Sequence, residues 1–269
     1  MPNALYPPLK PRSFAELLDA ILQIFRLSLL KCLPYATLAI IAGRLWMLYY
    51  LSQGRMPVLD SNDPVAVTLY GVGTLICVML SVTILLRQSA IAAGRPVTGA
   101  ADLLETLKRA PAIVAIALLV GTAVAVLMLP VLALAPPYRI AGVVMVAPAA
   151  YIGIALSFSL PALVLARKGV LASLAYSFRL VRGNWWRVAL IYVVGLMVVL
   201  TFLVLVAAIA TMAFTDNGGD DVAVTRAITA AAFLAVCAVG LTFCSALNLA
   251  LFGDLEVRRM ISGPVDRGT

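Results

Sequence analysis

The chain has 269 residues, of which 63% are hydrophobic and only 12% are charged, whereas a soluble domain is typically about 45–50% apolar and about 25% charged. A soluble core could not bury this much apolar surface, so the composition excludes a soluble globular protein and predicts one that is surrounded partly by lipid. The net charge of +8 is typical of a membrane protein, because basic residues gather at its cytosolic face and contact anionic headgroups there. Because no basic stretch is long enough for a separate nucleic-acid module, we expect no nucleic-acid partner.

Six predominantly apolar stretches are long enough to cross a bilayer, which takes about 20 residues in a helix. We expect helices because open sheets leave backbone groups unpaired in lipid. Pro136 and Pro137 separate the third stretch from the fourth. The predicted spans lie near residues 29–50, 66–92, 111–135, 140–166, 188–214 and 224–252. The sequence therefore predicts an all-α integral membrane protein with a single six-span domain over 1–269.

Three short amphipathic stretches each precede a pair of predicted spans. The first is SFAELLDAILQIF at 13–25, which begins with a capping box formed by Ser13 and Glu16. The others are AADLLETLKRA at 100–110 and VLASLAYSFRLVR at 170–182. Each carries an apolar stripe at helical spacing. We predict three transmembrane hairpins, each preceded by an amphipathic helix that lies in the cytosolic interface.

The three amphipathic stretches also align with one another without gaps, as ELLDAIL, DLLETLK and SLAYSFR. This alignment predicts a threefold repeat with units at 13–92, 98–166 and 170–252. The alternative is convergence, because a lipid interface selects the same amphipathic pattern in unrelated helices.

The basic residues are distributed unequally between the two sides of the predicted spans. One side, with the nearby span ends, holds 16 of the 20 Lys and Arg residues. These are Lys10, Arg12, Arg26, Lys31, Arg87, Arg95, Lys108, Arg109, Arg167, Lys168, Arg179, Arg182, Arg187, Arg258, Arg259 and Arg267. The other side holds four: Arg44, Arg55, Arg139 and Arg226. By the positive-inside rule, this bias predicts that both termini lie in the cytosol.

The segment RLVRGNWWR at 179–187 lies just before the fifth predicted span. Indole rings suit the headgroup level of a bilayer, and arginines there can reach phosphates. General membrane anchoring is one interpretation, and a specific site for an anionic ligand is the other. The residues predicted to contact anionic headgroups are Arg167, Lys168, Arg179, Arg182, Trp185, Trp186 and Arg187.

The residue types of the chain do not favour catalysis. There is no histidine, the four cysteines lie in apolar runs without a C-x-x-C pair, and no nucleophile-elbow or phosphate-loop motif occurs. The TDNGGDD loop at 215–221 carries three aspartates but lacks EF-hand spacing, so we interpret it as a solvated turn. We also expect no Asp or Glu deep in a span, and we assign Ser245 and Asn248 to hydrogen bonding between helices. No catalytic residue, metal site or cofactor is expected.

Two segments are similar to a known bacterial inner-membrane family. They are LKPRSFAELLDAILQIFR near the N-terminus and SFSLPALVLARKGVLASLAYSFRLVRGNWWRV, which begins at Ser157. With six spans in fewer than 300 residues, the chain resembles the membrane domain of glycerophosphodiester phosphodiesterase and the related YciC-like proteins. The resemblance implies a multi-pass protein of the bacterial cytoplasmic membrane. Some members of that family carry a fused soluble phosphodiesterase barrel. We expect no such barrel here, so its catalytic activity is not transferred.

Three functional hypotheses follow from these observations. The first is a non-enzymatic membrane component that organises or binds another membrane protein and holds membrane phospholipids at a basic cytosolic collar. The second is a transporter or flippase for an anionic or lipid-like molecule that enters between proline-kinked helices. The third, least favoured, is a membrane enzyme acting on lipids. No oligomeric state is predicted.

Overall fold

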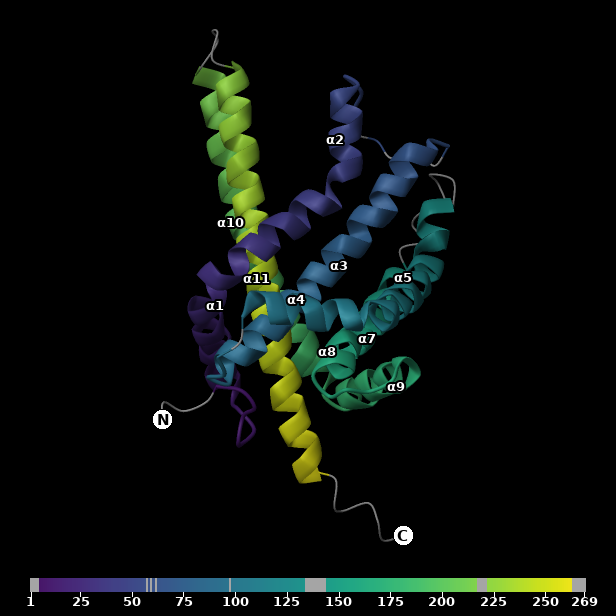
Figure 1. The fold of residues 1–269 in the computed structure, drawn as a ribbon, viewed down its shortest axis with the longest axis vertical. Coiled ribbons are helices and arrows are strands. Elements are labelled where there is room, and N and C mark those ends of the chain that lie inside the picture. Colours follow the sequence, from purple (N-terminus) through teal and green to yellow (C-terminus); the bar gives the residue numbers. More distant parts are fainter. Residues whose placement is uncertain are drawn as a thin grey trace.

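The computed structural model describes residues 5–56, 58, 60, 62–96, 98–133, 144–216 and 222–262, and all regular secondary structure within them is helical (Figure 1). The helices are α1 (Phe14–Gly43), α2 (Leu45–Ser52), α3 (Pro64–Ala92), α4 (Gly99–Lys108), α5 (Ala110–Ala133), α7 (Val146–Leu156), α8 (Ser159–Val164), α9 (Val170–Val181), α10 (Trp185–Asp216) and α11 (Val222–Ser262). The Pro136–Pro137 break and residues 217–221 of the acidic loop lie outside the described residues.

Six helical segments are long and apolar enough to cross a membrane. They are Phe14–Gly43, Pro64–Ala92, Ala110–Pro130, Val146–Val164, Trp185–Ile209 and Ile228–Ile261. The fourth includes both α7 and α8. The predicted all-α class and the number of spans are therefore confirmed.

The helices pack around α1, α3 and α11. Helix α1 contacts both α3 and α11, α10 packs along α11, and α5 packs against α7. At Gly73 of α3 an added Cβ would lie 2.1 Å from the carbonyl oxygen of Ala42, so the absence of a side chain allows α1 and α3 to approach closely. Figure 1 shows the start of α1, the end of α11, α4 and α9 toward one end of the molecule, and α2 toward the other. We call the first of these the basic end.

The first amphipathic stretch is not a separate helix. Helix α1 runs without interruption from Phe14 to Gly43, whereas the sequence predicted a short helix over 13–25 followed by a span from 29 to 50. No Gly or Pro lies between the two predicted segments, so nothing ends the helix there. The predicted capping box is confirmed, because the Ser13 N–H donates to Glu16 Oε2 at 2.7 Å and the Glu16 N–H donates to Ser13 Oγ at 3.2 Å.

The short helix α4 turns its polar face inward. Asp102 and Thr106 are buried, whereas Leu104 and Leu107 are 54% and 56% exposed. The Thr106 hydroxyl lies 3.0 Å from the hydroxyl of Thr83 on α3. Helix α4 therefore docks its polar side on the span that precedes it, and its leucines face outward.

Helix α9 shows the same arrangement. Ser173 and Ser177 are fully buried and Leu171 is 74% exposed. Over the aligned segments 102–108 and 173–179, the buried, half-buried and exposed positions coincide at all seven places. The segment 16–22 does not share this pattern.

The fourth span is broken between α7 and α8. Pro161 has no N–H with which to bond the carbonyl one turn earlier, and the helix is interrupted at Ser157 and Phe158. Ser177 of α9 satisfies the backbone at this break. Its hydroxyl donates to Ala155 O at 2.7 Å and accepts from the Phe158 N–H at 3.2 Å.

Replacing this hydroxyl tests the role of α9. We expect Ser177→Ala to destabilise the protein by about 1–3 kcal/mol, because it leaves two buried backbone groups unpaired. Ser173→Ala is the matched control, since Ser173 is equally buried on the same helix but its hydroxyl bonds no described residue. The measurement is thermal unfolding in detergent micelles. Equal melting temperatures for the two variants would contradict this role.

Candidate functional site

The structure distributes the seven predicted headgroup-contacting residues over separate places. Arg187 is tied to the end of α11, and Trp185 packs inward. Three of the seven residues follow the α8–α9 turn in the sequence and are exposed: Arg179, Arg182 and Trp186. Arg167 and Lys168 lie in that turn and line a hollow of the surface. The segment RLVRGNWWR therefore does not converge on a single site.

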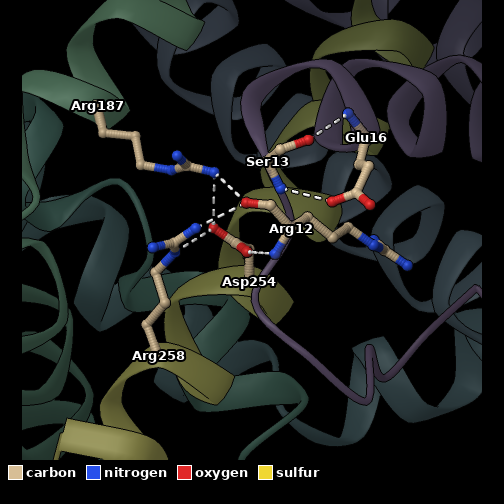
Figure 2. A network of polar contacts seen from close by, with 6 residues as sticks. All are labelled: Arg12, Ser13, Glu16, Arg187, Asp254 and Arg258. Atoms are coloured by element: carbon tan, nitrogen blue, oxygen red, sulfur yellow. Dashed lines mark hydrogen bonds and ion pairs between the residues drawn. The ribbon is translucent and has the colours of Figure 1, made fainter.

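Arg187 belongs to a network around the fully buried carboxylate of Asp254 (Figure 2). The Arg187 Nη2 lies 3.3 Å from Asp254 Oδ2, and the Arg258 Nε lies 2.9 Å from the same oxygen. The backbone N–H of Arg12 donates to Asp254 Oδ1 at 2.7 Å. One carboxylate therefore joins the segment before α1, the start of α10 and the end of α11. We call this group the Asp254 network.

Both arginine side chains of the network also bind the backbone of the N-terminal segment. The carbonyl oxygen of Arg12 accepts hydrogen bonds of 2.7 Å from Arg187 Nη2 and from Arg258 Nη2. The Arg12 guanidinium in turn donates to Leu5 O at 2.8 Å. Burial lowers the pKa of Arg12, and the nearby Asp254 opposes this shift. The network holds the N-terminal segment against the basic end of the bundle.

The two tryptophans of the segment take different positions. Trp185 stacks on Tyr151 of α7 with a centroid separation of 5.6 Å. Trp186 contacts Trp185 edge-to-face and is 81% exposed. Of the pair, Trp186 has the exposure that a ring at the headgroup level requires.

A hollow between α3, α4 and α8 brings together basic residues that are far apart in sequence. A cavity of about 260 Å³ there is lined by Arg95, Arg109 and Arg167 together with two acidic side chains of α4. An adjoining cavity of about 390 Å³ shares Arg109 and Arg167 and adds Lys168. We call the site formed by these four basic residues the basic hollow.

The acidic side chains beside the basic hollow are already engaged. Glu105 forms an ion pair of 2.7 Å with Arg109, as the i,i+4 spacing allows. Asp102 forms one of 3.3 Å with Arg87. Burial raises the pKa of Asp102, and Arg87 acts in the opposite direction.

The four basic residues differ in how they are held. Arg109 donates to the carbonyl oxygens of Leu163 and Val164 at 3.0 and 3.1 Å, so it caps the last turn of α8. The side chains of Arg95 and Arg167 are exposed and form no hydrogen bond or ion pair with any residue that the structure describes. These two guanidiniums leave all their donors available to a ligand.

Lys168 is oriented by an aromatic ring. Its Nζ lies 4.3 Å from the ring centroid of Tyr176 on α9, which is a cation–π contact. The Tyr176 hydroxyl donates to Glu256 Oε1 at 2.9 Å. Burial and the charge of Glu256 raise the pKa of Tyr176 to about 12, so the phenol stays protonated. Lys168 is therefore fixed at the edge of the basic hollow.

The sequence pattern predicts no anion-binding role for Arg95, Arg109 or Asp254. Arg95 and Arg109 contribute to the predicted orientation, and Arg109 is also at i,i+4 spacing from Glu105. The signal for Asp254 is its position four residues before Arg258, which places acid and base on one helix face. Nothing local in the sequence indicates that Arg95, Arg109 and Arg167 meet.

Chemically, the basic hollow can hold an anion. Guanidinium groups stay protonated at any physiological pH and present paired donors to phosphate or carboxylate oxygens. Among the described residues, no cluster of three Cys, Asp or Glu side chains could hold a metal ion.

A single neutralising substitution tests the importance of the Asp254 network. We expect Asp254→Asn to lower the free energy of unfolding by about 3 kcal/mol, because two arginines lose the buried charge that pairs them. Asp19→Asn is the control, since Asp19 is exposed and, among the described residues, bonds only Gln23. The readout is the melting temperature of the purified protein in detergent. A fall no larger than that of the control would show that the network does not stabilise the fold.

Comparison with known protein families gives a match over the second half of the chain. Residues 134–262, just under half of the chain, match the family described as the membrane domain of glycerophosphoryl diester phosphodiesterase. No curated protein and no solved structure matches the chain. The matched segment contains Asp254 and Arg167 but not Arg95 and Arg109. Over residues 134–262 the chain is therefore similar to the membrane domain of glycerophosphoryl diester phosphodiesterase, the same family that its sequence resembles.

Proposed function

We propose that this protein is a non-enzymatic, multi-pass component of the bacterial cytoplasmic membrane that binds anionic lipid headgroups in the basic hollow. The observation that carries the proposal is the meeting of Arg95, Arg109 and Arg167 around one cavity, with Arg95 and Arg167 unpaired among the described residues. We also propose that the basic end faces the cytosol. This orientation is supported by the positive-inside rule, because 16 of the 20 basic residues in the sequence fall on that side of the predicted spans.

The chemistry of the hollow favours a phosphate-bearing ligand. Arginine matches the geometry of phosphate oxygens with two parallel hydrogen bonds, and such charge-assisted bonds are stronger than neutral ones. Arg109 supplies a third positive charge, which Glu105 partly neutralises. Lys168 adds a positive charge at the edge.

The surroundings of the hollow favour a lipid over a soluble anion. Leu104 and Leu107 of α4 and Leu171 of α9 are all more than half exposed, and other residues of these two helices line the hollow and the cavity that adjoins it. In a bilayer, these side chains suit contact with acyl chains. A phospholipid whose headgroup binds the arginines would therefore find an apolar surface for its acyl chains.

We propose binding rather than catalysis because the acidic side chains that line the hollow, among the described residues, are already paired with arginines. The guanidiniums do not deprotonate. Asp102 and Glu105 are paired with Arg87 and Arg109. These pairings suit positions that hold a ligand.

A carrier for a lipid-like molecule is the second candidate. It is favoured by the broken fourth span, since discontinuous membrane helices are typical of binding sites in transporters. A scrambling assay separates the two functions. Vesicles containing the protein would move a fluorescent anionic lipid between leaflets if it is a carrier, and would only retain that lipid if it is a binding component.

Neutralising the two unpaired arginines tests the proposed function. We expect the double variant Arg95→Gln/Arg167→Gln to bind phosphatidylglycerol at least about tenfold more weakly, because each basic residue near a lipid surface contributes about 1 kcal/mol. Binding is measured by native mass spectrometry of the full chain, with phosphatidylcholine as the zwitterionic reference.

The matched control is Arg55→Gln, which removes one exposed charge from the segment after α2. We expect its phosphatidylglycerol binding to equal that of the unmodified protein. If the double variant binds phosphatidylglycerol as tightly as the control, or if the unmodified protein does not distinguish the two lipids, the proposed function is wrong.

A further inference from the structure

A second cavity, of about 130 Å³, lies within the spans between α3, α8 and α11. Its polar lining comes from Ser81 of α3, Ser157 at the break before α8, and Ser245 and Asn248 of α11. The other lining groups are apolar side chains and the thiol of Cys244. No charged residue that the structure describes lines it.

Ser245 is the unusual member of this lining. It is only 7% exposed, and its hydroxyl has no hydrogen-bond partner among the described residues. A buried hydroxyl without a partner typically costs about 1–3 kcal/mol, and in hydrocarbon no solvent supplies one. The position of Ser245 therefore points to a partner that occupies the cavity.

The neighbouring serines offer acceptors to such a partner. The Ser81 hydroxyl donates to Cys77 O at 2.8 Å, and the Ser157 hydroxyl donates to Ile154 O at 2.8 Å. Each of these two hydroxyls donates its hydrogen to a carbonyl of its own helix, but its oxygen can still accept a hydrogen bond.

Asn248 is held by bonds within the bundle. Its Nδ2 donates to Cys244 O at 3.1 Å, and its Oδ1 accepts a hydrogen bond from the Tyr192 hydroxyl. The amide therefore has a fixed orientation at the cavity wall.

We propose that this cavity binds a neutral hydroxyl group, which either the glycerol part of a membrane lipid or water supplies. A hydroxyl can accept from Ser245 and donate to Ser81 or Ser157, and it brings no charge into a site without counter-charges. The volume would hold about four waters at about 30 Å³ each. The cavity would equally admit the free hydroxyl end of a diacylglycerol, whose third glycerol position carries no ester. This inference does not depend on occupancy of the basic hollow.

The sign of a stability change tests whether the Ser245 hydroxyl has a partner. If the cavity is empty, Ser245→Ala removes an unpaired polar group and raises the melting temperature. If a hydroxyl occupies it, the same change removes a hydrogen bond and lowers the melting temperature, which is our prediction. Ser173→Ala is the control, because the buried Ser173 hydroxyl also lacks a described partner but lines neither this cavity nor the basic hollow. A rise for both variants would overturn the proposal.

The native thiol in the lining gives a second, independent test. Cys244 lines the cavity, whereas Cys32 is fully buried and lines none of the cavities described here. We would compare two single-cysteine proteins in nanodiscs, keeping Cys244 or Cys32 and replacing the other cysteines by alanine. With methyl methanethiosulfonate, we expect Cys244 to react at least about tenfold faster, because reactivity follows access. Equal rates would show that the cavity admits no small polar molecule and would overturn the proposal.

The lipid composition of the nanodiscs separates the two sources of the hydroxyl. Diacylglycerol added to phosphatidylcholine should slow the reaction of Cys244 if a lipid glycerol group occupies the cavity. An unchanged fast rate would assign the site to water. Ser245→Val in the Cys244-only protein should slow the reaction in both cases, because it narrows the cavity and removes the Ser245 hydroxyl from its wall. An unchanged rate in this variant would contradict the assignment to this cavity.

Discussion

The hydrocarbon of a bilayer offers no hydrogen-bond partner, so each polar group within it must find one inside the protein. This constraint accounts for the parts of the bundle that an apolar core alone would not require. Gln88, fully buried on α3, donates to Ser28 of α1 at 3.2 Å and to the carbonyl oxygen of Thr242 on α11 at 2.9 Å. Ser177 closes the backbone at the broken fourth span, and the hydroxyl of Thr83 meets that of Thr106. These contacts fix which faces of the helices turn inward, while most of the exposed large hydrophobic side chains among the described residues are aliphatic.

At the basic end, arginine serves two different purposes. In the Asp254 network, Arg187 and Arg258 neutralise a fully buried carboxylate and bind the backbone of Arg12, so both guanidiniums are engaged within the fold. In the basic hollow, the exposed Arg95 and Arg167 line a cavity and form no hydrogen bond or ion pair with a described residue. The first arrangement stabilises the meeting of three distant segments. The second leaves positive charge at the position where we propose a headgroup binds.

The sequence was sufficient for the helical class and for the six spans, because their apolar length dominates any local signal. It could not predict that Leu104 and Leu171 face outward while Thr106 and Ser177 face the bundle, since an amphipathic stripe has the same pattern in either orientation. The shared burial pattern of 102–108 and 173–179 supports the predicted repeat for its second and third units, and the repeat as a whole stays a prediction. The basic hollow depends on long-range packing of three helices. Asp254 lies two residues beyond the predicted end of the sixth span at 252, so the apolar pattern of the sequence does not indicate its network.

The central claim is that these helices cross a bilayer with the basic end in the cytosol. The most direct measurement uses a protein in which Cys32, Cys77, Cys237 and Cys244 are replaced by alanine and one new thiol is introduced. Lys108→Cys places the thiol at the basic end of the bundle, and Gln53→Cys places it after α2 at the opposite end. Both native side chains are exposed. A membrane-impermeant maleimide added to intact cells should label the thiol at position 53 and reach the one at 108 only after the membrane is permeabilised. Labelling of position 108 in intact cells would contradict the orientation, and with it the proposal that cytosolic-leaflet headgroups bind the basic hollow.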